Sequence, residues 1–145
     1  MVNICFTFEL GFCNGNMHMD ILVNDNVCYQ LRDSQQSDLL VDLDVPWPSV
    51  LQFCLTNKNM KTDTEIDQQG AVVKDKYIRV RDIAVGKFPL LERVIYDVCD
   101  YIPHNQQPCR DIYWAYPGTV TMTLDQASPM HWHLKHKNML FFRNT

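Results

Sequence analysis

Short segments in which apolar and polar residues alternate recur along this chain, and they constrain its fold more than any other feature. In residues 4–10 the apolar side chains occupy every second position, at Ile4, Phe6, Phe8 and Leu10. The same period of two recurs in residues 38–45 and 76–85, and residues 50–56 form a further strand-like run. A period of two is typical of a β-strand with one buried face, so we expect core strands in these segments.

Turn residues separate the expected strands. Residues 17–23 and 27–31 flank Asn24-Asp25-Asn26, residue types that tolerate a left-handed backbone, and we expect a hairpin there. Residues 89–101 are the one helical candidate, because Pro89 suits a first turn and apolar residues follow at three- and four-residue spacing. Residues 119–124 and 131–137 indicate two closing strands. This order predicts an all-β fold, an antiparallel, jelly-roll-like sandwich with one short helix.

Length, charge and cysteine content set limits on the class of protein. The 145 residues suit a single domain over 1–145, and 13 Lys and Arg against 17 Asp and Glu, without a basic cluster, argue against a nucleic acid partner. The longest apolar runs are too short to span a membrane, and the first residues lack the pattern of a signal peptide. Six cysteines without a C-x-x-C pair could form three disulfides, but we expect free thiols in a chain of this kind.

An acidic segment between two expected strands is the first candidate site. Residues 62–70 carry Asp63, Glu65 and Asp67 before a Gln68-Gln69-Gly70 turn, and Asp75 follows. Hard oxygen donors gathered in a loop suit Ca²⁺, which binds six to eight oxygens. The segment does not follow the EF-hand pattern, and the alternative is a long hairpin whose polar residues only contact solvent.

Aromatic and histidine residues give further candidates. Tyr113, Trp114 and Tyr116 lie in a turn-like run that ends at Pro117-Gly118, where they could stack on sugar rings or instead pack in the core. His131 and His133 would share one face of a strand and could bind Zn²⁺ or Fe²⁺, although packed or exposed histidines are the simpler interpretation. No nucleophile or phosphate-loop motif is present, so we expect no enzyme activity.

Two stretches resemble calcium-dependent, xylan-binding carbohydrate-binding modules. Residues 16–27, NMHMDILVNDNV, are similar to the hairpin of that family, G-x-x-H-M-x-L-x-V-D-G-x-x-V. Residues 51–59 and 75–86 are similar to its strand ending in Asn and to its D-R-N-L-x-V-x-x-I-x-V-x-G strand, with a variable calcium loop between them. The resemblance implies a β-sandwich in which sugar hydroxyls complete the coordination of Ca²⁺.

The resemblance also implies a set of metal ligands. Asp75 is the first candidate, and Asn57, Asp63 and Asp67 lie in the segment that would surround the metal. The Arg-Asn pair that follows the aspartate in the family is Lys76-Tyr77 here, so the sequence does not match the family at these sugar contacts.

Nearly the whole chain also resembles small proteins encoded by tailed bacteriophages of marine cyanobacteria. The shared positions include Tyr101-x-Pro103, the run from Pro117 to Met122, and Pro129-x-x-Trp132-x-Leu134. This resemblance implies synthesis in a host cytoplasm and a place on the virion. Our first hypothesis is therefore a binding module for a glycan of the host surface, and the alternative is a decoration or tail component that binds itself or other virion proteins.

Overall fold

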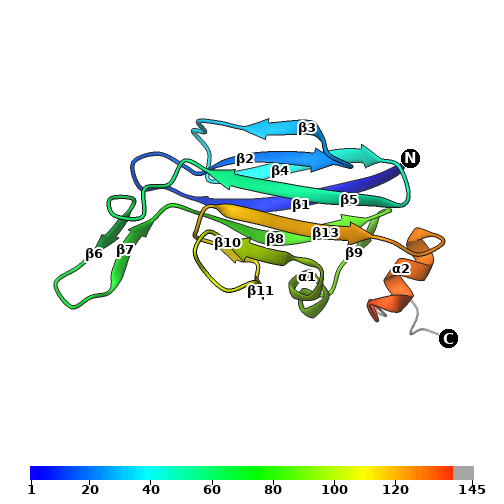
Figure 1. Cartoon of the computed structure of the whole chain (residues 1–145). Helices are drawn as coiled ribbons and strands as arrows, with labels where there is room; N and C mark the ends of the chain where they lie inside the picture. The colour runs from blue at the N-terminus through cyan, green and yellow to red at the C-terminus, as the bar shows by residue number, and fades with distance from the viewer. Residues whose placement is uncertain (139–145) are drawn as a thin grey trace.

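The computed structural model describes residues 1–138, which form a sandwich of two antiparallel sheets (Figure 1). The first sheet has the order β12-β8-β1-β4, with β9 beside β8, and the second has the order β11-β10-β13-β5-β2-β3. The strands of the first sheet are β1 (Val2–Gly11), β4 (Asp38–Val45), β8 (Tyr77–Val85), β9 (Phe88–Pro89) and β12 (Tyr113–Trp114). Those of the second are β2 (His18–Val23), β3 (Asn26–Leu31), β5 (Ser49–Thr56), β10 (Asp100–Pro103), β11 (Cys109–Arg110) and β13 (Gly118–Leu124). The predicted all-β sandwich is confirmed.

The alternating segments bury their apolar faces between the two sheets. β1 pairs with β4 on one side and β8 on the other, with Phe6 opposite Val41 and Ile83. From Ile4 to Leu10 the even-numbered residues of β1 are buried while the odd-numbered residues are partly exposed, as the period of two requires. Phe53 on β5 meets Phe6 edge to face, with ring centroids 5.3 Å apart, so the two sheets share one core.

The predicted hairpin is formed by β2 and β3. Asn24 and Asp25 have positive φ of 49° and 70°, the left-handed conformation that a two-residue hairpin turn of this kind requires. The Asn24 side chain also accepts a hydrogen bond from the Val50 amide, which ties the turn to β5. Residue types that tolerate a left-handed backbone thus fix the register of β2 against β3.

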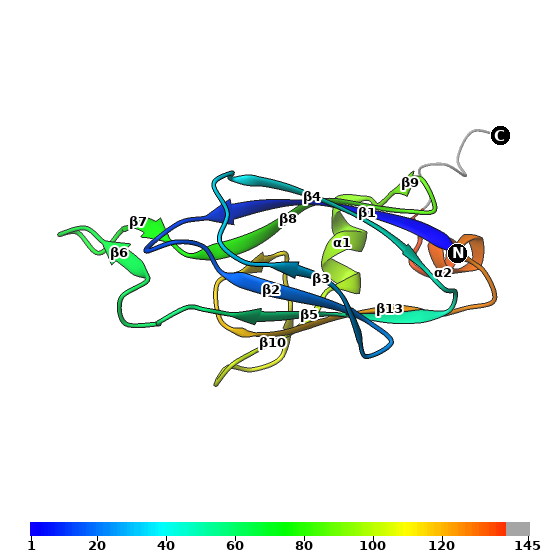
Figure 2. The ribbon, with the colours of Figure 1, turned by 90° about the horizontal axis from the view of Figure 1, so that it is seen from above.

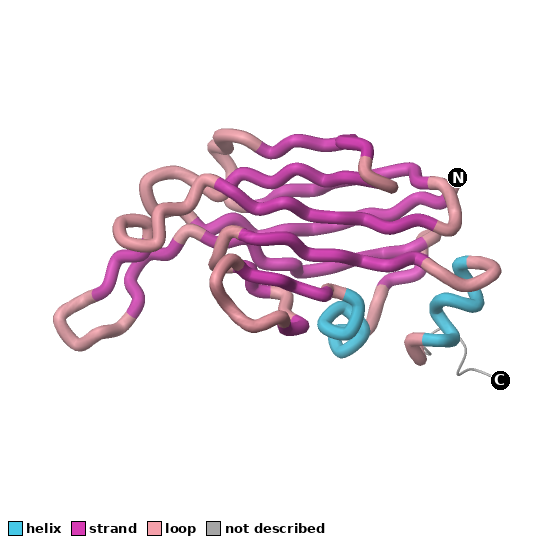
Figure 3. Tube along the Cα trace, viewed as in Figure 1, coloured by secondary structure: helices cyan, strands magenta, loops and turns pink. Residues whose placement is uncertain are grey.

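A third, two-stranded sheet projects from one end of the sandwich. It consists of β6 (Thr64–Ile66) and β7 (Val72–Asp75), joined by a turn at Asp67–Gly70 in which Gly70 has φ 84°. Figure 3 shows this hairpin extending away from the two large sheets, opposite the end that carries the last helix. The acidic segment is therefore a hairpin and not a loose loop.

The first helix, α1 (Glu92–Val98), is shorter than the predicted range 89–101. Pro89 belongs to β9 and Asp100 begins β10, so pairing with neighbouring strands limits the helix at both ends. Its buried residues are Val94, Ile95 and Val98. Figure 2 shows α1 between β8 and β13, where it closes one side of the sandwich.

The strand predicted at residues 131–137 is wrong, because the structure has a helix there, α2 (Pro129–Lys135). Ser128 is its N-cap and accepts a hydrogen bond from the His131 amide, and Pro129 occupies the first turn. The helix buries Trp132, whose indole N–H donates to the Thr123 carbonyl at 2.9 Å. Packing of Trp132 against the end of β13 outweighs the strand-like pattern.

His133 of α2 is fully buried and held as a neutral ring. Its Nε2 lies 2.9 Å from the Val85 carbonyl, which can only accept, and its Nδ1 lies 2.9 Å from the Asn138 amide nitrogen. The Leu91 amide donates to the Asn138 side-chain oxygen and so sets the orientation of that amide. Burial lowers the pKa of His133, although its hydrogen bond to Val85 opposes the shift.

Stability is expected to fall as the pH drops below about 6.5, the ordinary pKa of histidine, because the unfolded chain then binds a proton that folded His133 does not. The loss continues down to the lowered pKa of the folded state. Urea denaturation at about pH 7.5 and about pH 5.5 should show a lower free energy of unfolding at the lower pH. The difference between the two pH values should be smaller in His133→Gln. Burial also lowers the pKa of His136, so the difference between the two proteins isolates His133. Equal losses in both proteins would contradict this role.

All six cysteines, which lie within the described residues, are free thiols. Cys13 and Cys99 are buried, whereas Cys28 and Cys109 are exposed. Neither helix in the part of the chain that the structure describes is long and apolar enough to cross a membrane.

Candidate functional site

The residues predicted to bind calcium lie around the base of the β6–β7 hairpin. Asn57 directly follows β5, Asp63 precedes β6, and Asp75 ends β7. The amide of Lys76 donates to the carbonyl of Asp63, and Thr64 pairs with Asp75, so the two ends of the hairpin meet where it leaves the sandwich. This topology brings Asp63 and Asp75 into one region.

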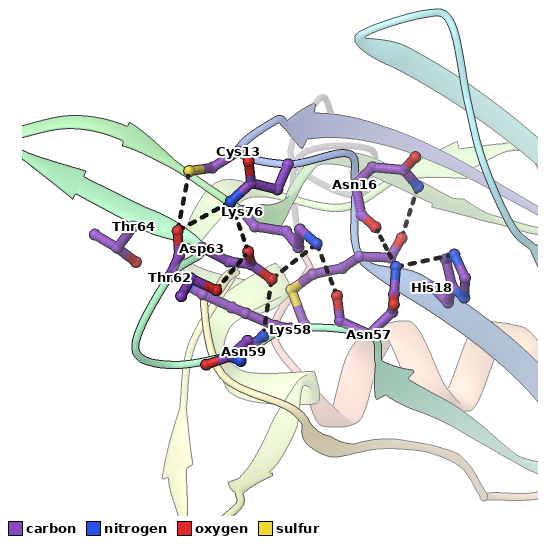
Figure 4. Close-up of polar contacts among 12 residues, drawn as sticks. Cys13, Asn16, His18, Asn57, Lys58, Asn59, Thr62, Asp63, Thr64 and Lys76 are labelled. Atoms are coloured by element: carbon purple, nitrogen blue, oxygen red, sulfur yellow. Dashed lines mark hydrogen bonds and ion pairs between the residues drawn. The ribbon is translucent and has the colours of Figure 1, made fainter.

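A buried lysine binds Asp63. The Lys76 ammonium lies 2.9 Å from Asp63 Oδ2 and donates to the Asn57 carbonyl at 3.0 Å, and both charged side chains are almost fully buried (Figure 4). Asp63 also accepts hydrogen bonds from the Asn59 amide and the Asn14 side chain. These bonds, with that of Asn59 the strongest, hold the pKa of Asp63 far below its ordinary value despite burial.

A second buried lysine binds Asp75. The Lys58 side chain is 1% exposed, and its ammonium lies 2.7 Å from Asp75 Oδ1 and 2.5 Å from the Ala115 carbonyl. Asp75 also accepts from the Thr64 hydroxyl at 2.7 Å and from the Tyr113 hydroxyl at 3.0 Å. Burial alone would raise the pKa of Asp75, but the bonds from Lys58, Thr64 and Tyr113 outweigh it and lower the pKa.

The other two predicted ligands do not join these carboxylates. The Asn57 side chain donates to the Asn16 carbonyl and lies 3.1 Å from the His18 ring (Figure 4). Asp67 is exposed at the tip of the hairpin, where its carboxylate accepts from the amides of Gln69 and Ala71 and stabilises the turn. The structure thus brings Asp63 and the backbone of Asn57 together on Lys76, places Asp75 on Lys58, and leaves Asp67 apart.

The predicted calcium ligands do not fit a calcium ion in this arrangement. Ca²⁺ needs six to eight oxygens at 2.3–2.6 Å, yet the carboxylates of Asp63 and Asp75 form two separate ion pairs, each with its own ammonium group. Among residues 1–138, no group of three or more His, Cys, Asp or Glu side chains is arranged to hold a metal ion. At the hairpin base the predicted ligands Asp63 and Asp75 are bound by two lysines that the prediction did not include.

A cavity of about 470 Å³ lies beside Asp75, between the loop after β10 and strand β12. Three tyrosines line it together with exposed amide side chains and a carboxylate, namely Tyr101, Tyr113, Tyr116, Gln106, Gln107 and Asp111. A cavity of this size, with aromatic walls and a few polar groups, is typical of a small-ligand site. Tyr113 links it to the hairpin base through its bond to Asp75.

Two of the predicted aromatic residues face this cavity. Tyr113 is 38% exposed and stacks with one face on Tyr77, with centroids 4.5 Å apart. Tyr116 is 39% exposed, and its amide and carbonyl both bond to the buried Tyr101 hydroxyl, which fixes the backbone that carries the ring. Burial raises the pKa of Tyr101 to about 12, so its hydroxyl keeps its proton at neutral pH and donates to Tyr116.

Trp114 is not part of this surface, which corrects its prediction as a ligand-binding residue. Its ring is 1% exposed and packs against Phe8 and Phe53. Because β12 alternates its side chains, Trp114 points into the core while Tyr113 points outward. Its indole N–H donates to the Asp111 carbonyl, so the ring is satisfied where it lies.

The histidine pair does not form a metal site. His131 and His133 lie two residues apart on a helix, about 200° apart around its axis, and not on one face of a strand. His131 bonds to Ser128 at the surface, whereas His133 is buried with both ring nitrogens in use.

Sequence reasoning missed Lys58, Lys76, Tyr101 and the two glutamines. Both lysines are next to residues that were singled out, Asn57 and Asp75, but lysine is normally exposed and gives no signal of burial. Tyr101 was noted only within a shared Tyr-x-Pro pattern, and its role depends on a turn that brings Tyr116 beside it.

No protein-family model matches the sequence, and no curated protein matches it. One similar solved structure is the selenomethionine form of vCBM60, from work on circular permutation as a link between two families of calcium-dependent carbohydrate-binding modules. It is 10% identical, with a TM-score of 0.53, and the match covers 88% of this chain and 97% of that one. A structure of vCBM60 with galactobiose is 13% identical, with a TM-score of 0.49 and coverages of 83% and 97%. The first match shows that this chain shares the fold of a carbohydrate-binding module.

Proposed function

We propose that this chain is a non-enzymatic glycan-binding module and that the tyrosine-lined cavity is its binding site. The observation that carries the proposal is the half-exposed ring of Tyr116 at the cavity wall, on a backbone that the Tyr101 hydroxyl holds in place. A fixed aromatic face can stack on the apolar face of a sugar ring, and Gln106 and Gln107 offer donors and acceptors for its hydroxyls. The fold shared with a carbohydrate-binding module supports this function.

The resemblance to phage proteins suggests the setting of this function. In that setting the ligand is a polysaccharide of the host surface and the module is carried by the virion. The cavity needs no metal ion to present Tyr116, because hydrogen bonds to the Tyr101 hydroxyl hold the backbone that carries the ring. Calcium binding at the hairpin base is therefore a separate question from glycan binding.

Replacing Tyr116 with alanine is expected to weaken glycan binding at least tenfold, about 1.4 kcal/mol, because the stacking surface is lost. A glycan array would first identify a ligand, and calorimetric titration would then compare the variant with the parent chain. Tyr96→Ala is the matched control, since Tyr96 is also a half-exposed tyrosine (38%) but lies on α1 outside the cavity. Equal weakening by both substitutions would contradict the assigned site.

The position of the ligand can be checked with the exposed cysteines. Cys109 lines the cavity, whereas Cys28 lies on the distant edge strand β3. Bound glycan should slow alkylation of Cys109 and leave the rate at Cys28 unchanged. Protection of Cys28 alone would place the ligand elsewhere.

One observation favours the alternative of an assembly role. The projecting hairpin exposes three apolar side chains, Ile66, Val72 and Val73, each more than half exposed. Exposed apolar side chains on a short sheet with open edge strands can pack against a second protein or a second copy of this chain. Concentration-dependent self-association in sedimentation velocity, unaffected by any glycan, would favour this role over the first.

A further inference from the structure

The hairpin base has the composition of a cation site but already contains two cations of its own. Asp63 and Asp75 are its two carboxylates, and each has a lysine of its own, Lys76 on Asp63 and Lys58 on Asp75. We propose that these two ammonium groups take the place of a calcium ion in this sandwich, so that the hairpin base and the adjoining cavity wall are ordered without any metal.

The charges at the hairpin base are balanced as the structure stands. Each carboxylate has one ammonium partner at 2.7 or 2.9 Å, and all four side chains are mostly or fully buried. A calcium ion added to this set would place two further positive charges beside two buried ammonium groups. Because repulsion between like charges is strong where water is excluded, metal entry would require a lysine to leave the interior.

The carboxylate oxygens are also occupied as acceptors. Asp63 accepts from Lys76, from the Asn59 amide and from two neighbouring side chains, and Asp75 accepts from Lys58, Thr64 and Tyr113. An ammonium group has three protons to donate and does not need six or more ligands, so each lysine can satisfy a single carboxylate, which is too few ligands for calcium.

Lys58 connects the hairpin base to the cavity. Its ammonium bonds to Asp75 and to the Ala115 carbonyl, and Ala115 directly precedes Tyr116 in the cavity lining. Asp75 in turn accepts from Tyr113, the other half-exposed tyrosine. The lysine therefore holds the segment that carries Tyr116 in the way that a bridging metal would, and glycan binding is expected to be independent of calcium. Only this last step rests on the proposed function.

The decisive measurement uses the unmodified chain. Calcium chloride titrated into chelator-treated protein should give no saturable heat, and thermal melts in excess EDTA and in excess Ca²⁺ should have the same midpoint. Saturable calcium binding, or a rise in the midpoint with calcium that Asp75→Asn removes, would overturn the proposal. This result does not depend on finding a glycan. If a ligand is found, EDTA should leave its Kd unchanged, and loss of binding that Ca²⁺ restores would also overturn the proposal.

A chemical rescue tests the role of the ammonium group directly. Lys76→Ala should lower the melting midpoint, and n-propylammonium, which replaces the missing part of the side chain, should restore part of the loss. The uncharged 1-propanol should not, since it supplies the shape without the charge. Lys74→Ala is the matched control, because Lys74 lies on the same hairpin but is exposed and 4.0 Å from Glu65. A Lys76→Ala midpoint equal to that of the parent would contradict the proposal, and if this variant does not fold, the calcium titration still decides.

Discussion

Replacing Lys76 with methionine is expected to lower the free energy of unfolding by about 3–5 kcal/mol, because it leaves the Asp63 carboxylate buried without its counter-ion. Hydrogen bonds from Asn14 and Asn59 would remain, but they cannot neutralise the charge. A domain of this size has roughly 5–15 kcal/mol of stability in total, so the loss would be severe. Urea denaturation at neutral pH measures it.

The double variant Lys76→Met with Asp63→Asn separates charge from packing. Removing both charges should recover much of the loss, since a neutral amide with a partner is cheaper to bury than a lone carboxylate. Lys74→Met, an exposed lysine of the same hairpin, should change stability by less than about 0.5 kcal/mol. A double variant as unstable as the single one would show that lost packing, and not the unpaired charge, is responsible.

Replacing Trp114 with alanine is expected to cost about 3–5 kcal/mol, because a fully buried ring is lost from the centre of the aromatic core. Its neighbours Phe8 and Phe53 come from different sheets, at centroid distances of 5.9 and 5.5 Å. The empty space left by the missing ring would therefore loosen the contact between the two sheets. The loss of its bond to the Asp111 carbonyl adds to the effect. Chemical denaturation and near-ultraviolet circular dichroism measure both changes.

Tyr116→Ala gives the comparison for Trp114→Ala. A half-exposed ring at the cavity wall should contribute little to stability, so this variant should melt near the parent chain while losing ligand. The two substitutions, two residues apart, are thus expected to differ: Trp114→Ala lowers stability, whereas Tyr116→Ala weakens ligand binding and leaves stability nearly unchanged. A Trp114→Ala protein as stable as the parent would contradict the core assignment.

The large sheets could be predicted because their signal is local. In β1 and β8, burial on one face imposes a period of two, and at Asn24 and Asp25 the turn conformation selects residue types. The short strands β10, β11 and β12 gave no such signal. Each has four residues or fewer and exists because it pairs with a longer neighbour.

The last helix shows where local patterns conflict. Residues 131–137 alternate in a strand-like way, but Ser128 followed by Pro129 is a pattern typical of the start of a helix. The N-cap hydrogen bond and the buried Trp132 decide in favour of the helix. Start signals therefore deserve weight even when the pattern after them suggests a strand.

The candidate site was located by its acidic residues but not by what binds them. Asp63 and Asp75 indicate a cation, and a sequence alone does not say whether that cation is a metal or a lysine of the same chain. Lys58 meets Asp75 across 17 positions, a partnership that only the folded hairpin creates. Likewise, alternation in β12 separates Tyr113 from Trp114, and this required knowing that the two residues form a strand.

The central position of β1 has a consequence for how the chain reaches its fold. Both partners of β1 come later in the sequence, and β8 begins only at residue 77, so β1 cannot complete its pairing until these distant segments have been synthesised. Pairing over such separations slows folding, typically to milliseconds or seconds for β-sandwiches. Until β8 arrives, one edge of β1 stays open to strands of other chains. Yield on expression should therefore depend more on temperature and chain concentration than the stability of the finished sandwich would suggest.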